Sequence, residues 1–311
     1  MNNFTIGQLI KALREQQGVS QEQLTAGVMQ RHNLSKIESG QQTVSFGKLA
    51  LLFERLGYSL RRFFPAMLSA EENAFYDLRD KINACIRAND KEGTIQGIHE
   101  LEGTALFADK RYEKDGMIRQ FWLSSKAALG LMEEENLNNI RAWLDEAIRI
   151  TIPAFNEDKV PRYLLTLEEI EIITMMASVY EKGKNRAQAT TLLEKLANNI
   201  RKNYMDRHQK ARALTLVLYI LSNCLGRQGH YQEALAVCNE AIDVGQVGEA
   251  CGLVPKLLYN KAYALCCLGQ MDDVKPLLRQ SFYGHMMMGR ADRAAGVKVR
   301  AKRNWGISIE D

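Results

Sequence analysis

Two short segments near the N-terminus constrain the fold of this chain more than any other feature. They are Val19-Ser-Gln-Glu-Gln-Leu24 and Leu34-Ser-Lys-Ile-Glu-Ser-Gly40. Ser20 is a good cap for the helix that follows it, and Leu34 and Ile37 are spaced to bury one face of a second helix. The two segments therefore predict a helix-turn-helix, whose second helix can enter the major groove of DNA.

The distribution of charge supports this interpretation. Residues 1–65 hold eight Lys or Arg and four acidic residues, so their net charge of +4 equals that of the whole 311-residue chain. The remaining residues are neutral overall. Positive charge confined to one segment is typical of a surface that meets phosphates.

Hydrophobic spacing predicts five helices within residues 1–65. The expected ranges are 6–17, 21–28, 30–39, 46–56 and 59–64. In the third helix, Leu34 and Ile37 face the core, so the polar side chains beside them must point outward. Those outward residues are Arg31, His32, Ser35 and Lys36.

Residues 5–64 resemble the Cro/C1-type (XRE) helix-turn-helix family. The matching elements are Ser-Gln-Glu-Gln-Leu at 20–24, Leu-Ser-Lys-Ile-Glu-Ser-Gly at 34–40 and Leu-Leu-Phe-Glu-Arg-Leu-Gly at 51–57. The resemblance implies a phosphate contact from Gln21, and base or backbone contacts from the third, recognition helix. The candidate DNA-binding residues are Gln21, Gln30, Arg31, His32, Ser35 and Lys36.

Side-chain chemistry suggests individual roles within this set. Arg31 can hold guanine O6 and N7 in a bidentate contact, and Lys36 can contact guanine or phosphate. His32 is either a base contact or a neutral polar surface residue. The turn Gly27-Val28-Met29-Gln30 departs from many family members, because it is one residue shorter and lacks a Ser, Thr, Asp or Asn cap. A turn of this length is similar to that of the Rgg/PlcR/PrgX-type regulators.

Residues 66–311 predict a second domain that is purely helical. Pro65 ends the first domain, and Ser69-Ala-Glu-Glu72 is a capping box that opens a new helix. Almost everything after it is amphipathic with helical spacing, and no stretch alternates convincingly as a strand. Consecutive helix pairs favour an all-α chain whose second domain is a right-handed α-solenoid. The helices expected at 70–88, 91–108, 115–134 and 136–150 fit this architecture as degenerate repeats.

Two segments of this second domain resemble tetratricopeptide repeats. One runs from Leu221 to Leu235 around Gly229, and the other starts near Asn260 around Gly269. A weaker copy surrounds Gly183. The spacings between these glycines exceed the consensus period of about 34 residues, which predicts longer helices or longer loops.

In such a solenoid, the first helix of each pair lines a concave face. Counting from the turn glycines places a candidate peptide-binding set on that face: Tyr219, Asn223, Tyr259, Asn260 and Tyr263. Asn side chains offer both a donor and an acceptor to an extended peptide backbone, and aromatic walls suit its side chains. The alternative interpretation is that the tyrosines pack between repeats and that Asn223 caps a local turn.

No pattern in the chain predicts catalysis, a cofactor or a metal site. The five histidines are scattered, the six cysteines form no CxxC pair, and HExxH, GxSxG, Walker and Rossmann patterns are absent. No apolar run reaches the ~18 residues needed to span a bilayer, and the N-terminus has no secretory signal. We therefore expect a cytoplasmic protein that is not an enzyme and has no cofactor, metal or membrane partner.

Over its full length the chain resembles the Rgg/PlcR/PrgX group (RRNPP family) of Gram-positive peptide-pheromone receptors. The resemblance implies a quorum-sensing transcription regulator that binds a double-stranded DNA operator as a homodimer. It also implies a short signalling peptide, bound in the concave groove, that switches activation or repression. The main alternative is a ligand-independent DNA-binding repressor whose repeats serve only dimerisation or docking of a protein partner. A groove rich in Asn, Tyr and Arg favours the peptide, whereas a closed or acidic one favours the alternative.

Overall fold

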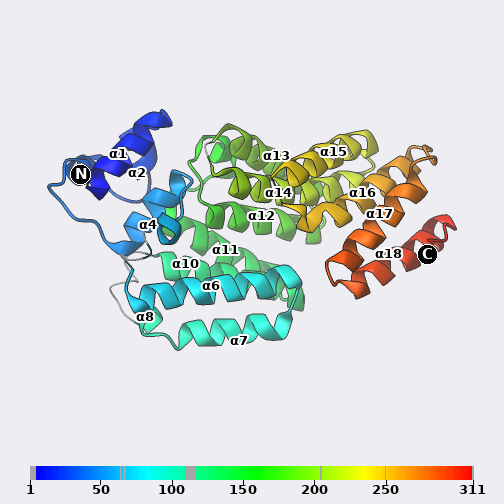
Figure 1. Cartoon of the computed structure of the whole chain (residues 1–311), viewed down its shortest axis with the longest axis horizontal. Helices are drawn as coiled ribbons and strands as arrows, with labels where there is room; N and C mark the ends of the chain where they lie inside the picture. Colours follow the sequence, from blue (N-terminus) through cyan, green and yellow to red (C-terminus); the bar gives the residue numbers. More distant parts are fainter. Residues whose placement is uncertain are drawn as a thin grey trace. The chain divides into compact units, whose positions relative to one another are not determined.

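The structure, a computed structural model, describes residues 5–309 except 64, 66, 67, 109–115, 204 and 249. Within these residues every regular element is a helix and none is a strand (Figure 1). The predicted all-α class, a helix-turn-helix followed by helical pairs, is confirmed. In the described ranges, no helix combines the length and the apolar character that crossing a bilayer requires.

The N-terminal region folds into the five predicted helices. They are α1 (Ile6–Gln16), α2 (Gln21–Thr25), α3 (Arg31–Glu38), α4 (Phe46–Arg55) and α5 (Leu60–Phe63). The predicted end of the fifth helix, residue 64, lies outside the described residues. Capping boxes begin the first two helices, formed by Thr5 with Gln8 of α1 and by Ser20 with Gln23 of α2. Each box satisfies backbone N–H groups that have no partner inside the helix.

The predicted end of α2 is wrong by three residues, whereas the other predicted ends that the structure describes in this region differ by one residue at most. α2 ends at Thr25 instead of residue 28, because Ala26 leaves helical geometry and Gly27 has a φ of +75°. α3 begins at Arg31, so Gln30 is its N-cap residue with an extended backbone, and the Gln30 side chain makes no capping hydrogen bond. The turn is therefore longer than the sequence indicated.

These helices enclose a hydrophobic core. Ile10 of α1, Leu24 of α2 and Leu34 of α3 are fully buried. The other buried members are Ile37, Leu49, Ala50, Leu52, Phe53, Leu56 and Leu60. Burying a side chain of this size contributes roughly 1.5–3 kcal/mol, so the spacing of Leu34 and Ile37 decides which face of α3 remains outside.

The chain consists of two compact units. The first comprises residues 1–183 with 203–206, and the second comprises residues 184–202 with 207–311. The domain boundary expected at residue 65 falls within the first unit, where α4 contacts helices that follow it. An independent domain of residues 1–65 stays a prediction.

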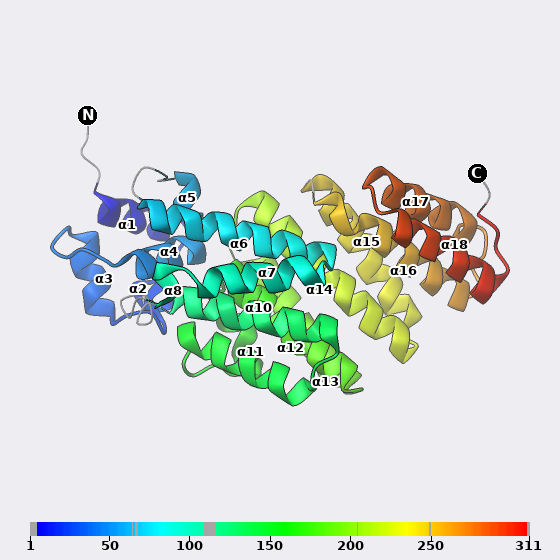
Figure 2. The same cartoon turned by 90° about the horizontal axis from the view of Figure 1, so that it is seen from below.

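After α5, the first unit continues with paired helices. α6 (Ala70–Ala88) opens with the expected capping box of Ser69 and Glu72. One helix was expected at 91–108, but α7 (Lys91–Glu102) and α8 (Ala105–Ala108) are separate, and the Thr104 Oγ accepts from the Phe107 N–H at the start of α8. The unit is completed by α10 (Met117–Glu133), α11 (Leu137–Thr151), the 3₁₀ helix η2 (Glu157–Arg162) and α12 (Leu167–Lys182). α6 packs on α7, and α10 packs on both α7 and α11 (Figure 2).

The second unit is a series of helices in which each packs on the next (Figure 1). Its elements are α13 (Arg186–Lys202), α14 (Arg207–Gln228), α15 (Tyr231–Val247), the 3₁₀ helix η3 (Cys251–Leu253), α16 (Val254–Cys267), α17 (Val274–Met287) and α18 (Ala291–Trp305). Gly229 ends α14 and Gly269 follows α16, with φ of +85° and +76°. Only glycine adopts such angles without strain, which explains why these two residues mark the repeats in the sequence.

Candidate nucleic-acid interface and ligand-binding face

α3 presents the predicted recognition residues outward. Arg31, His32, Ser35 and Lys36 are exposed, and so is Gln30 at the N-cap. Leu34 and Ile37 lie in the core on the opposite side. The structure thus places the predicted residues on one accessible face, while their contacts with DNA stay a prediction.

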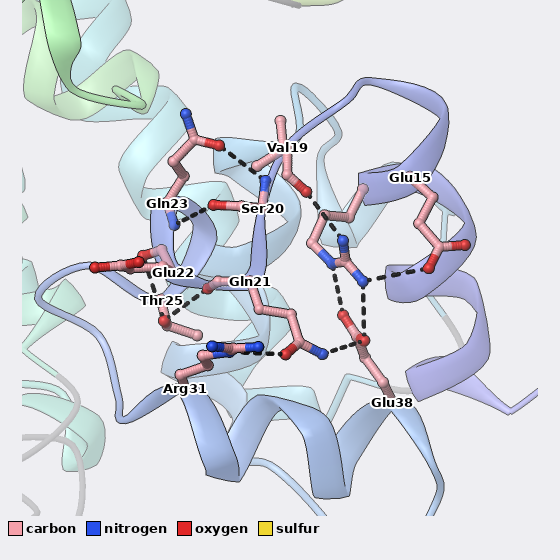
Figure 3. A network of polar contacts seen from close by, with 10 residues as sticks. Glu15, Val19, Ser20, Gln21, Glu22, Gln23, Thr25, Arg31 and Glu38 are labelled. Atoms are coloured by element: carbon pink, nitrogen blue, oxygen red, sulfur yellow. Dashed lines mark hydrogen bonds and ion pairs between the residues drawn. The ribbon is translucent and has the colours of Figure 1, made fainter.

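A polar network behind α3 fixes its position against α1 and α2 (Figure 3). Arg14 donates to both carboxylate oxygens of Glu38, at 2.8 and 3.1 Å, and to the Val19 carbonyl at 3.0 Å. Gln21 donates to Glu38 Oε2 at 2.8 Å and accepts from Arg31 Nε at 3.4 Å. The bond to Glu38 raises the pKa of Arg14, so the buried guanidinium stays charged.

The network limits what Gln21 can offer to DNA. Its amide nitrogen has two N–H donors, and one of them already serves Glu38. One N–H is left for the predicted phosphate contact of Gln21, which stays a prediction. The amide oxygen meanwhile holds the side chain of Arg31 beside α2. Gln21 therefore positions Arg31 in addition to any phosphate contact of its own.

Internal ion pairs use part of the positive charge of this region. Three arginines form such pairs: Arg14 with Glu38, Arg55 with Glu169, and Arg61 with Asp77 and Asp80. Among the described side chains of residues 5–61, the basic residues without an acidic partner are Lys11, Arg31, Lys36 and Lys48. Two of these four, Arg31 and Lys36, lie on α3 among the residues predicted to contact DNA.

Arg55 of α4 organises the unusual turn, and the sequence did not predict this role. Its Nη1 donates to the carbonyls of Leu24 and Ala26, at 3.1 and 2.6 Å, and its Nη2 donates to the Thr151 carbonyl at 3.3 Å. Nη2 is also 3.5 Å from Glu169 Oε1, and the two side chains are 2% and 0% exposed. Arg55 therefore satisfies carbonyls at the end of α2 and ties the turn to α11 and α12.

Gly27 brings the backbone of this turn against α11. A Cβ at Gly27 would lie 2.2 Å from the Thr151 carbonyl oxygen and 2.9 Å from Pro153 Cδ. Its φ of +75° is a second reason for glycine. Packing against α11 therefore determines the shape of the turn between α2 and α3. The missing cap in the sequence does not reveal this contact.

A second buried charge cluster joins α4 to α6 and α12. Arg79 donates to Glu54 and to Glu168, both at 3.2 Å, and Ser124 donates to the other oxygen of Glu168. Burial raises the pKa of Glu54 and of Glu168, although Arg79 opposes the shift. Burial also lowers the pKa of Arg79, but the two carboxylates outweigh it and the net change is upward.

In the second unit, the structure brings the predicted asparagines together. Asn260 Nδ2 donates to Asn223 Oδ1 at 3.0 Å and to Ser222 Oγ at 2.9 Å. Asn223 Nδ2 donates to the Tyr219 carbonyl one turn earlier on α14, at 3.1 Å. Both side chains are half-buried. Their hydrogen bonds hold them in fixed positions beside each other.

The predicted tyrosines lie around this pair with partners of their own. The ring centres of Tyr259 and Tyr263 are 5.9 and 6.0 Å from that of Trp305 on α18. Tyr219 lies under the Lys256 ammonium, with 5.2 Å from Nζ to the ring centre. Both interpretations of the tyrosines have support, since they pack between helices and also border the asparagines. We call Tyr219, Asn223, Lys256, Tyr259, Asn260 and Tyr263 the α14–α16 face, and its role in peptide binding stays a prediction.

Comparison with known proteins extends these observations. Residues 10–63 match the helix-turn-helix family model. No curated protein matches the chain by sequence. The chain is similar in structure to PlcR of Bacillus thuringiensis, solved in complex with the peptide PapR7 and DNA, at 14% identity and a TM-score of 0.61 over 94% of this chain and 98% of PlcR.

Two ComR proteins are similar in the same way. ComR of Streptococcus vestibularis in its apo form has 15% identity and a TM-score of 0.56, covering 96% of this chain and 98% of that protein. ComR of S. thermophilus, solved with DNA and its signalling peptide ComS, has 16% identity and a TM-score of 0.53, covering 97% and 100%. The chain therefore has the fold of these regulators from end to end.

Proposed function

We propose that this chain is a transcription regulator of the RRNPP type, which binds DNA and responds to a short signalling peptide. In this proposal it acts in the cytoplasm as a homodimer on a double-stranded operator. The observation that carries the proposal is the exposed set on α3, within a helix-turn-helix, in a chain that shares its full-length fold with PlcR and ComR. Both of those proteins were solved with DNA and a peptide.

The mechanism proposed is a shift between conformations. A peptide held on the α14–α16 face binds one arrangement of the helical repeats better than another, and so raises the population of that arrangement. The change alters the spacing of two recognition helices in the dimer, which must match the helical repeat of DNA. Asn223 offers its remaining N–H and Asn260 offers its Oδ1 acceptor to the peptide backbone, and Tyr219 and Tyr259 contact its side chains.

The DNA half of the proposal is tested on the full chain. Sites are first selected from a random duplex library with the wild-type protein, and affinities are then measured for Arg31→Ala and Lys36→Ala. We expect Arg31→Ala to lose roughly 1–3 kcal/mol on the selected site and to relax its sequence preference. Lys275→Ala is the matched control, because it removes an exposed lysine from α17. Unchanged affinity of Arg31→Ala would remove Arg31 from the interface.

The peptide half is tested with synthetic peptides encoded by short reading frames next to the gene. We expect one of them to change operator binding by the wild-type chain, and Asn223→Ala with Asn260→Ala to abolish the response while DNA affinity stays intact. A normal response in the double variant would refute the assignment of this face. If no peptide changes operator binding, the ligand-independent regulator is supported instead.

A further inference from the structure

Four basic side chains and one imidazole lie on α16, α17 and α18, which pack on one another in chain order, and the four cations act together on the imidazole. We call this set the cationic site: Lys256 on α16, His285 on α17, Arg290 at the N-cap of α18, and Arg293 and Arg300 on α18. Burial, together with the four positive charges, lowers the pKa of His285 to about 4. The imidazole is therefore neutral at pH 7, and the positive charge resides on the surrounding side chains.

No carboxylate balances Lys256 in the part of the chain that the structure describes. Its ammonium forms no ion pair there and instead lies over the Tyr219 ring. Burial, with the charges of Arg293 and Arg290, lowers the pKa of Lys256 to about 8. Lys256, Arg290 and Arg293 are half-buried and Arg300 is exposed. Like charges on neighbouring, partly buried side chains repel one another unless an anion joins them. The arrangement is thus suited to a bound anion.

His285 provides an independent observation. Its side chain is only 3% exposed, and its Nδ1 has no hydrogen-bond partner. Nearly all buried polar atoms in folded proteins are hydrogen-bonded, so an unpartnered one needs an explanation. A neutral imidazole carries one N–H, which can donate to a carboxylate oxygen. An anion in the cationic site would supply the missing partner.

The cationic site adjoins the asparagine pair through Lys256, which shares α16 with Asn260 and whose ammonium lies over Tyr219 of α14. Lys256 precedes Asn260 by four residues on α16, and Tyr219 precedes Asn223 by four residues on α14. Residues four apart share a helix face at about one 5.4 Å turn. An extended peptide covers that distance in about two residues. Arg300 borders the same region from α18, because its guanidinium is 4.9 Å from the Tyr259 ring centre.

We propose that the cationic site binds a carboxylate of the signalling peptide, about two residues from the backbone that Asn223 and Asn260 hold. The inference rests on the proposed function and adds the chemistry of its ligand. The carboxylate is either the C-terminus of the peptide or an Asp or Glu side chain. Charge-assisted hydrogen bonds from lysine and arginine are the strongest that a protein offers to such a group.

Three pools of synthetic random heptapeptides distinguish the two sources. The first pool has a free C-terminus and no Asp or Glu, the second is amidated and contains Asp and Glu, and the third is amidated and contains neither. Each pool is incubated with the full-length chain, and bound peptides are recovered by size exclusion and identified by mass spectrometry. We expect peptides from the first or the second pool to be retained at least about tenfold over the third, since a charged hydrogen bond is worth about that factor or more.

Variants locate the carboxylate on the protein. Lys256→Met with Arg300→Met should weaken the retained peptides by about tenfold to a hundredfold. Lys302→Met is the control, because it removes an exposed cation from a different face of α18, where each residue turns by about 100°. In the wild-type chain, the peptide should also shift the nitrogen resonance of the His285 imidazole. This readout does not depend on any variant folding.

Three results would contradict the carboxylate inference or the proposed function. Equal retention from all three pools would overturn the carboxylate inference and leave peptide binding intact. Retention from no pool would contradict the proposed function itself, and the inference with it. Equal loss in Lys302→Met and in the double variant would show that net charge alone attracts the peptide, which also overturns the cationic site.

Discussion

Replacing Arg79 with methionine tests whether the buried cluster joining α4 to α6 and α12 stabilises the first unit. Methionine keeps most of the packing, including the contact with Phe121, whose ring centre is 5.6 Å from the guanidinium carbon. It removes the cation that Glu54 and Glu168 share. The two carboxylates then face each other without compensation. The least costly response is protonation of one of them.

The cost of that protonation follows from the ordinary pKa of glutamate. Each unit between the pKa and the ambient pH costs about 1.36 kcal/mol. From 4.5 to pH 7 this amounts to about 3.4 kcal/mol for one carboxyl group. The side chains of Arg79 and Glu54 keep exposed fractions of 14% and 19%, so water relieves part of the penalty. We therefore expect Arg79→Met to lower the free energy of unfolding by about 2–3 kcal/mol at pH 7.

The loss of unfolding free energy in the variant should depend on pH, which a loss of packing alone would not produce. In the variant, the pKa of these carboxyl groups in the folded state rises further above that in the unfolded state. The folded state then binds a proton first as the pH falls, so the unfolding free energy rises relative to wild type between pH 7 and pH 5. At pH 5 the remaining penalty is about 0.7 kcal/mol.

The assay must report on the first unit alone, because a chain of two units does not unfold as a single transition. Trp122 on α10 and Trp143 on α11 lie in this unit, and Trp305 lies on α18. Urea denaturation followed by tryptophan fluorescence in a Trp305→Phe background therefore isolates it. Adding Glu54→Gln and Glu168→Gln should recover most of the loss. A deficit that is equal at pH 5 and pH 7 would refute the argument.

Two further predictions concern the turn and the cationic site. Gly27→Ala should lower the thermal midpoint and weaken DNA binding, because the added Cβ meets the Thr151 carbonyl oxygen. Gly40→Ala is the control: its φ is +74° but nothing lies within 4 Å of the added Cβ, so it should cost only the roughly 1–2 kcal/mol of a left-handed backbone. Equal losses in the two variants would contradict the packing of the turn. Peptide affinity, measured by calorimetry, should fall as the pH rises through about 8, because a bound carboxylate favours the charged form of Lys256. Over this range the arginines of the site stay charged and the His285 imidazole stays neutral. Lys256→Met should abolish that dependence, and a pH dependence unchanged in this variant would show that another group titrates.

The sequence predicted the elements that depend on local patterns. Capping boxes at Ser20 and Ser69 mark helix starts because a side chain and a backbone N–H three residues apart satisfy each other. Gly229 and Gly269 mark turns because a positive φ favours glycine. The outward face of α3 followed from the spacing of Leu34 and Ile37, since two buried positions on a short helix determine the rest.

Contacts between distant segments were not predictable in this way. Arg55 occupies a position in the pattern of α4 where arginine looks like an ordinary surface residue. Its partners are Glu169 and backbone carbonyls, including that of Thr151, and carbonyls leave no trace in the residue types. The early end of α2 has the same origin, because the turn adapts to α11. The cationic site was not predictable because its members are distributed over three helices. The net charge of residues 66–311 is also zero, so it does not indicate a cluster of cations.

The internal arginines also change what the net charge of the N-terminal region means. Three guanidinium groups form ion pairs with carboxylates within the first unit, those of Arg14, Arg55 and Arg61. Their charge is therefore already neutralised and does not add to binding of phosphates. If the chain binds DNA as proposed, the four described cations without acidic partners are the ones that residues 5–61 can offer to phosphates. Each phosphate neutralised adds about 0.9 to the slope of affinity against salt, which limits these cations to a slope of about 3.6 per protomer. In the proposed homodimer, a second recognition helix doubles the number of cations that face the phosphates. Both helices meet one duplex only when their spacing matches the helical repeat of DNA, so in the proposed mechanism this spacing is the quantity that a bound peptide changes.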